Sequence, residues 1–359
     1  MIIAMLVTAT VFLAFSNGAN DNFKGFATVW GSATLDYRRA LIIATIAAIA
    51  GSVASLLIAD GLVKQFSGKG LVPDDIIALP SFALAVASGA AITVMIATRV
   101  GLPISTTHAL VGGLVGAGLA SGTGAVDFSS LGKTFFLPLL LSPVISALLG
   151  LIAYKALPRY KAETDCVCIV ETQGTGGGNV FARTATLPQV VIGASPDCIV
   201  HNGIIAQTSV SGMLDATHIA SAATICFARA LNDTPKLAGL LVAAKAVSPN
   251  LSLVGIAAAM AIGGVLLSRR VAQTMSERIT SLSPQQGVPA NLITAALVLA
   301  ASKFGLPVST THVAVGAISG VGAGAGTLSW PTVRTILLSW VGTLPLAAAI
   351  AWIVASVAG

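Results

Sequence analysis

The sequence predicts an all-α polytopic membrane protein made of two inverted-topology repeats of about five membrane segments each, with broken or re-entrant helices. Three observations lead to this fold class. Charged residues make up only 9% of the 359 positions and apolar residues 55%, whereas a soluble domain carries about 25% charged residues. Apolar runs of about 20 residues, long enough to span a bilayer, recur without the alternation typical of barrel strands. Finally, two different motifs occur twice in the same order.

Basic residues cluster where apolar runs end, at Arg38 and Arg39, at 155–161, and at Arg269 and Arg270. This distribution follows the positive-inside bias of membrane proteins. It accounts for the net charge of +6 without a nucleic-acid partner. We therefore expect a multi-pass protein that contacts membrane lipid in the inner (plasma) membrane of the cell.

The duplicated motifs define the domain organisation. Gly101-Leu-Pro-Ile-Ser-Thr-Thr-His108 returns as Gly305-Leu-Pro-Val-Ser-Thr-Thr-His312, and Asn20-Asp21-Asn22-Phe23-Lys24 returns as Asn232-Asp233-Thr234-Pro235-Lys236. We expect a first membrane repeat at 1–157, a cytoplasmic linker at 158–212 and a second, inverted repeat at 213–359. The linker is polar and glycine-rich, with β-like runs such as Leu-Pro-Gln-Val-Val-Ile-Gly. Inverted repeats with interrupted helices are typical of secondary transporters whose site lies between the repeats, near the bilayer midplane.

Each Ser-Thr-Thr-His motif predicts a helix that begins inside the membrane. Pro103 and Pro307 disfavour helix in the residue before them, and Ser105 and Ser309 are good N-cap residues. The first N–H groups of such a helix lack partners, and the helix dipole favours an anion there. Two facing helix N-termini would offer a cradle for a tetrahedral oxyanion, whose hydroxyl ligands are Ser105, Thr106, Thr107, Ser309, Thr310 and Thr311. The simpler alternative is that these hydroxyls only satisfy local backbone groups.

The Asn-Asp motifs place carboxylates inside apolar spans, where an ionised group is costly unless it is paired. Gly18, Gly25 and Pro235 suggest that both helices unwind at the motif. Carbonyl oxygens freed by unwinding would suit a hard cation such as Na⁺, together with the side-chain oxygens of Asn20, Asp21, Asn232 and Asp233. The alternative is an ion pair within each helix, because Lys24 and Lys236 each follow an aspartate by three residues.

Charge balance at such a site favours a companion cation. Phosphate carries about −1.5 to −2 charges near neutral pH, and two helix N-termini supply about +0.5 each. Two aspartates and two lysines would then leave the site negative by about one charge, and by about three if the lysines point to the membrane surfaces. Na⁺ or H⁺ as coupling ion would correct the deficit, and no other cofactor is predicted. His108 and His312 are accessory candidates that would donate to the anion, shuttle protons, or remain neutral and bonded to a neighbouring helix.

These motifs resemble those of the inorganic phosphate transporter (Pit) family. The resemblance rests on Ser16-Asn-Gly-Ala-Asn-Asp21, Leu214-Asp-Ala-Thr-His218, Phe227-Ala-Arg-Ala-Leu-Asn-Asp-Thr-Pro-Lys236 and the paired Ser-Thr-Thr-His segments. It implies phosphate uptake driven by a cation, with the Asn-Asp pairs at the ion and phosphate site, the two Ser-Thr-Thr segments on phosphate, and a homodimeric assembly. Many relatives carry an acidic residue in the helix before each Ser-Thr-Thr-His motif. Here the second-half match is Asn291, and the first half has only apolar residues near Ala87.

Two other function classes are compatible with some of these residues. An anion channel could use the Ser-Thr-Thr-His loops as a filter, but a filter would not need buried aspartates. A membrane-embedded hydrolase is disfavoured, because the sequence has neither a Gly-x-Ser-x-Gly nor a His-Glu-x-x-His motif. The prediction is therefore a phosphate symporter and not an enzyme, with the two Ser-Thr-Thr stretches meeting at one site.

Overall fold

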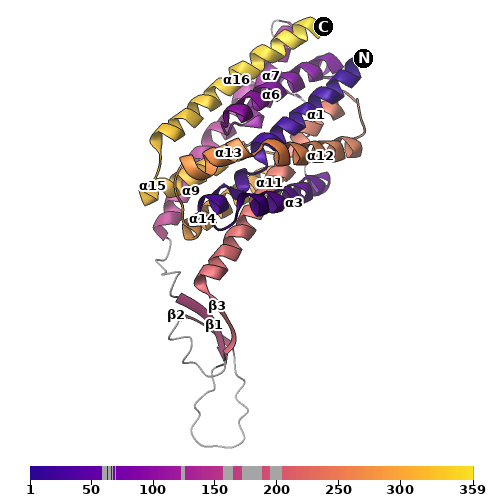
Figure 1. The fold of residues 1–359 in the computed structure, drawn as a ribbon. Helices are drawn as coiled ribbons and strands as arrows, with labels where there is room; N and C mark the ends of the chain where they lie inside the picture. Colours follow the sequence, from indigo (N-terminus) through magenta and orange to yellow (C-terminus); the bar gives the residue numbers. More distant parts are fainter. Residues whose placement is uncertain are drawn as a thin grey trace, which may run out of the picture.

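The computed structural model of the chain describes residues 1–58, 63, 66, 68, 70–122, 126–156, 165–171, 188–194 and 204–358. Long helices pack side by side in one bundle, and a small sheet lies beyond one end of it (Figure 1). The N- and C-termini lie together at the end of the bundle that is far from the sheet.

The helices of the first half follow the predicted pattern of spans and breaks. The long helix α1 ends at Asp21, within the first Asn-Asp motif, and short helical turns continue the chain. The elements are α1 (Ile2–Asp21), the 3₁₀ turn η1 (Lys24–Phe26), α2 (Ala27–Gly31), α3 (Tyr37–Ile58), α5 (Asp74–Ile77), α6 (Pro80–Val100), α7 (Thr106–Ala120), α8 (Phe128–Ser130), the π-helical turn η2 (Leu131–Phe136) and α9 (Leu137–Ala156).

The second half contains a comparable series of helices. It begins with α11, a helix of 34 residues that rises from the sheet into the bundle (Figure 1). The elements are α11 (Val210–Ala243), α12 (Pro249–Leu267), α13 (Arg269–Gln273), the π-helical turn η3 (Thr274–Arg278), α14 (Pro284–Lys303), α15 (Thr310–Ala325) and α16 (Trp330–Ala358).

Helix packing relates the two halves to each other. Helix α1 packs on α6 and α12, while α11 packs on α14 and α3. The last helix of each half crosses over to the other half: α16 packs on α6 and α7, and α9 packs on α14 and α15. Gly51 of α3 abuts the Phe227 carbonyl of α11, and Gly263 of α12 abuts the Phe15 carbonyl of α1. Gly51 and Gly263 are 212 positions apart, and so are Phe15 and Phe227. The same spacing separates Asn20 from Asn232 in the duplicated motifs.

Many of these helices have the length and composition of membrane spans. Among the described residues six helical segments qualify: Ile2–Gly31, Tyr37–Ser55, Pro80–Val100, Phe128–Ala156, Asn250–Leu267 and Trp330–Ala358. Their outward faces are apolar, as Leu140 in α9 and Val341 in α16 illustrate, each at least 70% exposed. Lipid-facing apolar side chains around a polar interior are the arrangement expected in a bilayer. Helices α7 and α15 have 15 and 16 residues and are shorter than the roughly 20 needed to cross.

The linker departs from the all-α prediction. Strands β1 (Asp165–Glu171), β2 (Pro188–Ala194) and β3 (Ile204–Ser209) form an antiparallel sheet in the order β2-β1-β3. Strand β2 coincides with the β-like run seen in the sequence, and valine and isoleucine favour this conformation. The fold is therefore helical in the membrane part, with a small sheet inserted between α9 and α11.

The expected unwinding at the Asn-Asp motifs is right for one copy and wrong for the other. Helix α1 stops at Asp21, but α11 continues through Asn232, Asp233 and Pro235 to Ala243. Gly25 of the first motif corresponds to Leu237 in the second. Leucine favours helix by nearly 1 kcal/mol over glycine, which helps α11 to continue beyond its internal proline.

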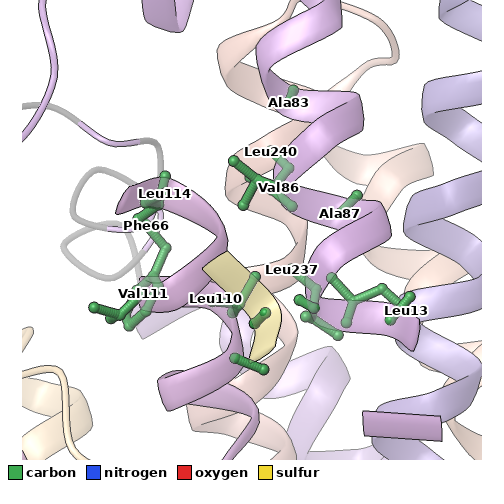
Figure 2. Packing of buried hydrophobic residues seen from close by; sticks show 14 of the residues in the cluster. Leu13, Phe66, Ala83, Val86, Ala87, Leu110, Val111, Leu114, Leu237 and Leu240 are labelled. Atoms are coloured by element: carbon green, nitrogen blue, oxygen red, sulfur yellow. The ribbon is translucent and has the colours of Figure 1, made fainter. Parts of the chain in front are cut away.

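A buried apolar cluster fixes the position of the first Ser-Thr-Thr-His helix. Leu110 and Leu114 of α7 are fully buried in an apolar cluster that also contains residues of α6, α1 and α11, and Figure 2 shows Leu114 beside Phe66. Leu13 of α1 and Leu237 of α11 belong to the same cluster. The polar N-terminus of α7 is thereby held between the two motif-bearing helices.

Candidate functional site

The N-termini of α7 and α15 meet, as the sequence predicts. Ser105 caps α7 by accepting a 3.1 Å hydrogen bond from the backbone N–H of His108, and Ser309 caps α15 in the same way from His312 at 3.2 Å. The hydroxyl of Thr311 donates to the carbonyl of Ile104 at 3.0 Å, while the hydroxyl of Thr107 donates to the carbonyl of Val308 at 3.3 Å. The loop before each helix therefore binds the first turn of the other.

Two buried lysines join this junction from the motif-bearing helices. The ammonium of Lys24 donates to the hydroxyl of Thr311 at 2.8 Å and to the carbonyl of Ile104 at 2.9 Å. The ammonium of Lys236 donates to the hydroxyl of Thr107 and to the carbonyl of Val308, both at 3.0 Å. Of the two orientations left open by the sequence, the structure has both lysines pointing into the site.

Each lysine also pairs with the aspartate of its own motif. Lys24 forms an ion pair with Asp21, and Lys236 forms one with Asp233 at 3.0 Å. These ion pairs, between residues three positions apart, are the alternative that the sequence offered to a cation-binding site at the aspartates. The side chains are 0–6% exposed, so water screens the attraction little.

Arg229 is a component of the site that the sequence interpretation missed. Its side chain is 4% exposed, and its Nη2 lies 3.2 Å from a carboxylate oxygen of Asp21 and 3.4 Å from the hydroxyl of Thr311. Within the described residues its Nε and Nη1 have no hydrogen-bond partner. A guanidinium presents five donors, so most of its capacity to bind an anion is unused. An arginine inside an apolar helix, four residues before Asp233, was the signal available in the sequence.

A small cavity lies beside Arg229, where the motif-bearing helices α1 and α11 meet α3 and α12. Its volume is about 20 Å³, enough for one or two water molecules or a small ion. Its lining includes Asp21, Asp233, Arg229, Ser52 and Asn22. The Oδ2 atom of Asp233 is buried and has no partner in the described part of the chain. The cavity therefore adjoins both carboxylates and the partly unpaired guanidinium.

The asparagines of the two Asn-Asp motifs bind the C-terminal ends of α6 and α14, the helices that precede the two Ser-Thr-Thr-His motifs. The amide of Asn20 donates to the hydroxyl of Thr98 at 2.9 Å and to the carbonyl of Leu102 at 3.1 Å. The amide of Asn232 donates to the hydroxyl of Ser302 at 2.7 Å. Their Oδ1 atoms are buried without partners among the described residues. These contacts, which the motif alone did not reveal, position α6 and α14 relative to the carboxylates.

Most of the Ser-Thr-Thr hydroxyls already take part in protein hydrogen bonds. Besides the bonds of Ser105, Thr107, Ser309 and Thr311, the hydroxyl of Thr106 donates to Asn17 at 2.7 Å. Thr310 is buried with them, at 3% exposure. Phosphate binding by these residues therefore requires that several of these bonds be exchanged for bonds to the anion.

The remaining residues predicted to assist the site, His108, His312 and Asn291, lie in two separate places. The rings of His108 and His312 contact each other edge to face, and His312 also stacks on Trp340 at 3.8 Å between centroids. Asn291 lies apart from them, where it accepts a 2.9 Å hydrogen bond from Thr28 and donates to Ser221 at 3.2 Å. His218, another residue of the quoted motifs, is 2.9 Å from the hydroxyl of Thr28.

Comparison with known families identifies the chain. A model of the phosphate transporter family matches residues 17–351. The chain belongs to the phosphate transporter family. It is accordingly a multi-pass membrane transporter and not an enzyme, and the resemblance that the duplicated motifs indicated is confirmed.

Members of the phosphate transporter family from distant organisms match along nearly the whole chain. A Haemophilus influenzae protein named as a phosphate permease is 30% identical, covering 96% of this chain and 93% of its own. A similarly named protein of Thermococcus kodakarensis is 28% identical, covering 94% and 93%. The chloroplastic inorganic phosphate transporter 2-1 of Arabidopsis thaliana is also 28% identical, over 95% of this chain and 69% of its own.

A solved structure has the same fold. The structure named the sodium-dependent phosphate transporter superposes with a TM-score of 0.78 and covers 99% of this chain and 98% of its own, at 23% sequence identity. The helical architecture of this phosphate transporter family member is therefore an established one.

Proposed function

We propose that this chain imports inorganic phosphate by symport with a cation, Na⁺ or H⁺, through alternating access of two inverted repeats. The observation that carries this proposal is the buried guanidinium of Arg229 beside the junction of the α7 and α15 N-termini, whose Nε and Nη1 are unpaired within the described part of the chain. Charge-assisted hydrogen bonds from arginine suit phosphate oxygens in number and geometry. The helix N-termini add backbone donors for the same anion.

Phosphate would contact Arg229 and the two Ser-Thr-Thr segments, replacing the bonds that now join these segments to each other and to the lysines. Its ligands are proposed to be Ser105, Thr106, Thr107, Ser309, Thr310, Thr311 and Arg229. Because each lysine bonds to the helix tip of the opposite half, separating the halves breaks both crosswise contacts. Occupancy of the site would thus be coupled to the relative movement of the repeats.

Arg229 alters the charge balance on which cation coupling was predicted. Three cationic groups face two carboxylates, and the helix N-termini add about +0.5 charge each. Together they nearly neutralise a phosphate dianion, so neutrality alone no longer demands an extra cation. Cation coupling is supported instead by the buried Oδ2 of Asp233 and Oδ1 of Asn20 and Asn232, which have no hydrogen-bond partner among the described residues and are acceptors suited to a proton or metal ion. The name of the structurally similar sodium-dependent transporter supports it as well.

Inverted repeats are supported by the matching contacts of the two halves, such as Gly51 on Phe227 and Gly263 on Phe15. We place the protein in the plasma membrane as a homodimer, with membrane repeats at 1–157 and 213–359 and the linker at 158–212 in the cytoplasm. Crosslinking in native membranes followed by gel mobility tests the dimer.

The test is uptake of radiolabelled phosphate by proteoliposomes containing the full chain. Imposed Na⁺ and pH gradients should each be compared with no gradient, and at least one should drive accumulation above equilibrium. Counterflow separates a carrier from the alternative, an anion channel with filter loops: internal unlabelled phosphate accelerates entry of label only in a carrier. Uptake that no gradient drives and that lacks counterflow would refute the symporter.

A further inference from the structure

Each of the two buried ammonium groups is surrounded by the same three kinds of oxygen. Lys24 Nζ contacts the carboxylate of Asp21, the carbonyl of Ile104 and the hydroxyl of Thr311. Lys236 Nζ contacts the carboxylate of Asp233, the carbonyl of Val308 and the hydroxyl of Thr107. The two sets come from equivalent positions of the duplicated motifs, with the halves exchanged.

Hard cations bind oxygen ligands such as carboxylates and carbonyls, and backbone carbonyls freed where transporter helices are interrupted coordinate the coupling sodium ion. An ammonium group has three donors, and each lysine uses three on this set, at 2.8–3.0 Å for five of the six contacts. Both lysines are at most 2% exposed. An ion pair that only stabilised a kink would not require a carbonyl from the loop before the Ser-Thr-Thr-His helix of the same half and a hydroxyl of the opposite half.

We infer that Lys24 and Lys236 are tethered cations that occupy the two positions a sodium ion would take, so that transport by this chain does not require Na⁺. The inference rests on the proposed phosphate transport and specifies its coupling. An ammonium that is covalently attached keeps each carboxylate paired without taking up an ion from solution. It can also move only as far as its side chain allows, so it carries no charge across the membrane.

The surroundings of the small cavity also disfavour sodium. A metal ion there would be a fourth cationic centre near two carboxylates, because Arg229 pairs with Asp21 in addition to Lys24. Like charges that are buried close together repel strongly in a low-dielectric interior. Of the two coupling ions considered, the arrangement therefore leaves the proton.

The first test uses the unmodified protein. Its thermal unfolding should show the same Tm in sodium chloride as in choline chloride of equal ionic strength. In proteoliposomes with the same pH gradient and membrane potential, initial rates of labelled phosphate uptake should also be equal in the two media. A Tm that rises with Na⁺ in a saturable manner, or uptake that needs Na⁺, would overturn the inference.

The second test vacates the lysine positions with Lys24→Met, Lys236→Met and the double variant, which keep side-chain length and lose the charge. The freed oxygens should then accept sodium, and Na⁺ but not choline should raise the Tm of each variant by about 1–2 °C for each kcal/mol of binding free energy. Lys303→Met, at an exposed position, is the matched control and should show no sodium effect. Folded variants that gain no sodium effect would show that the lysines do not occupy cation positions.

The stability measurements keep this inference separate from the proposed function. If no gradient drives phosphate uptake, the symporter proposal fails, but the Na⁺ dependence of Tm still decides whether the lysines replace sodium. If the double variant is too unstable to purify, the single variants and the unmodified protein can still be measured. A contrary result with either of them is sufficient to refute the inference.

Discussion

Lys24, in the first half of the chain, donates a 2.8 Å hydrogen bond to the hydroxyl of Thr311, which lies 287 positions away in the second half. Lys236 and Thr107 form the reciprocal contact at 3.0 Å. Each half thus supplies the cation that binds the helix tip of the other. In this conformation the two contacts join the halves crosswise, and both are buried.

Removing one of these acceptors should weaken the junction and impair transport. Thr311→Val keeps the shape of the side chain but leaves an ammonium donor of Lys24 and a guanidinium donor of Arg229 without their partner. A buried donor left unsatisfied costs about 1–3 kcal/mol. Thermal unfolding should show this loss, and phosphate uptake should fall. Thr311→Ser retains the hydroxyl and is expected to behave like the unmodified protein; equal losses in both variants would contradict the role of the hydroxyl.

The two aspartates should respond unequally to neutralisation. Asp21 pairs with both Lys24 and Arg229, whereas Lys236 is the one ion-pair partner of Asp233 among the residues that the structure describes. Breaking a buried ion pair by removing one partner costs about 3–5 kcal/mol, so Asp21→Asn should lower the free energy of unfolding more than Asp233→Asn. Chemical denaturation of both variants measures the difference.

Uptake assays on the same two variants test the role of the carboxylates in coupling. Both Asp21→Asn and Asp233→Asn are expected to abolish gradient-driven phosphate uptake. Adding Lys24→Met to Asp21→Asn should restore part of the stability, because it removes one unpaired buried cation, without restoring uptake. Uptake at unmodified rates in both single variants would exclude a role in coupling.

Local chemistry was sufficient to predict some features of the site from the sequence. Pro103 and Ser105, repeated as Pro307 and Ser309, specify where α7 and α15 begin, and the structure has both caps. The break after Asp21 is likewise a local consequence of residues such as Gly25. The second motif lacks that glycine and remains helical. The similarity of the two motifs therefore led us to expect a helix break in both copies, although only the first copy has one.

Other features depend on how the halves pack and could not be read from either motif alone. The contact between Lys24 and Thr311 exists because the α7 and α15 tips cross, bringing each lysine to the opposite half. The residue of the first repeat that corresponds to Arg229 is Asn17, so the arginine is not duplicated. The repeat comparison therefore did not draw attention to it, although an intramembrane arginine is a functional candidate in its own right.

Replacing Arg229 by lysine should weaken phosphate binding even though the charge is kept. Lysine lacks the planar set of donors that binds two oxygens at once, and a hydrogen bond to a charged group contributes about 1.5–3 kcal/mol. Because 1.4 kcal/mol is a factor of ten in affinity, the KM for phosphate in Arg229→Lys should rise about 10–100-fold. The exposed Arg334 provides the control Arg334→Lys, and an unchanged KM in Arg229→Lys would remove the guanidinium from the binding site.

Close approach of helix backbones at glycine should be required on both sides of the site. A Cβ added to Gly51 would overlap the carbonyl oxygen of Phe227, two residues before Arg229, and a Cβ on Gly263 would overlap that of Phe15. Because the overlapping atom is backbone, the helices must move apart, and overpacking of this kind costs about 1–3 kcal/mol. Gly51→Ala and Gly263→Ala should both lower the Tm and slow uptake, since they displace the helices that carry Arg229 and Asp21. Gly255 lies in the same helix as Gly263, and among the described residues no heavy atom lies within 4 Å of a Cβ added to it, so Gly255→Ala should neither lower the Tm nor slow uptake.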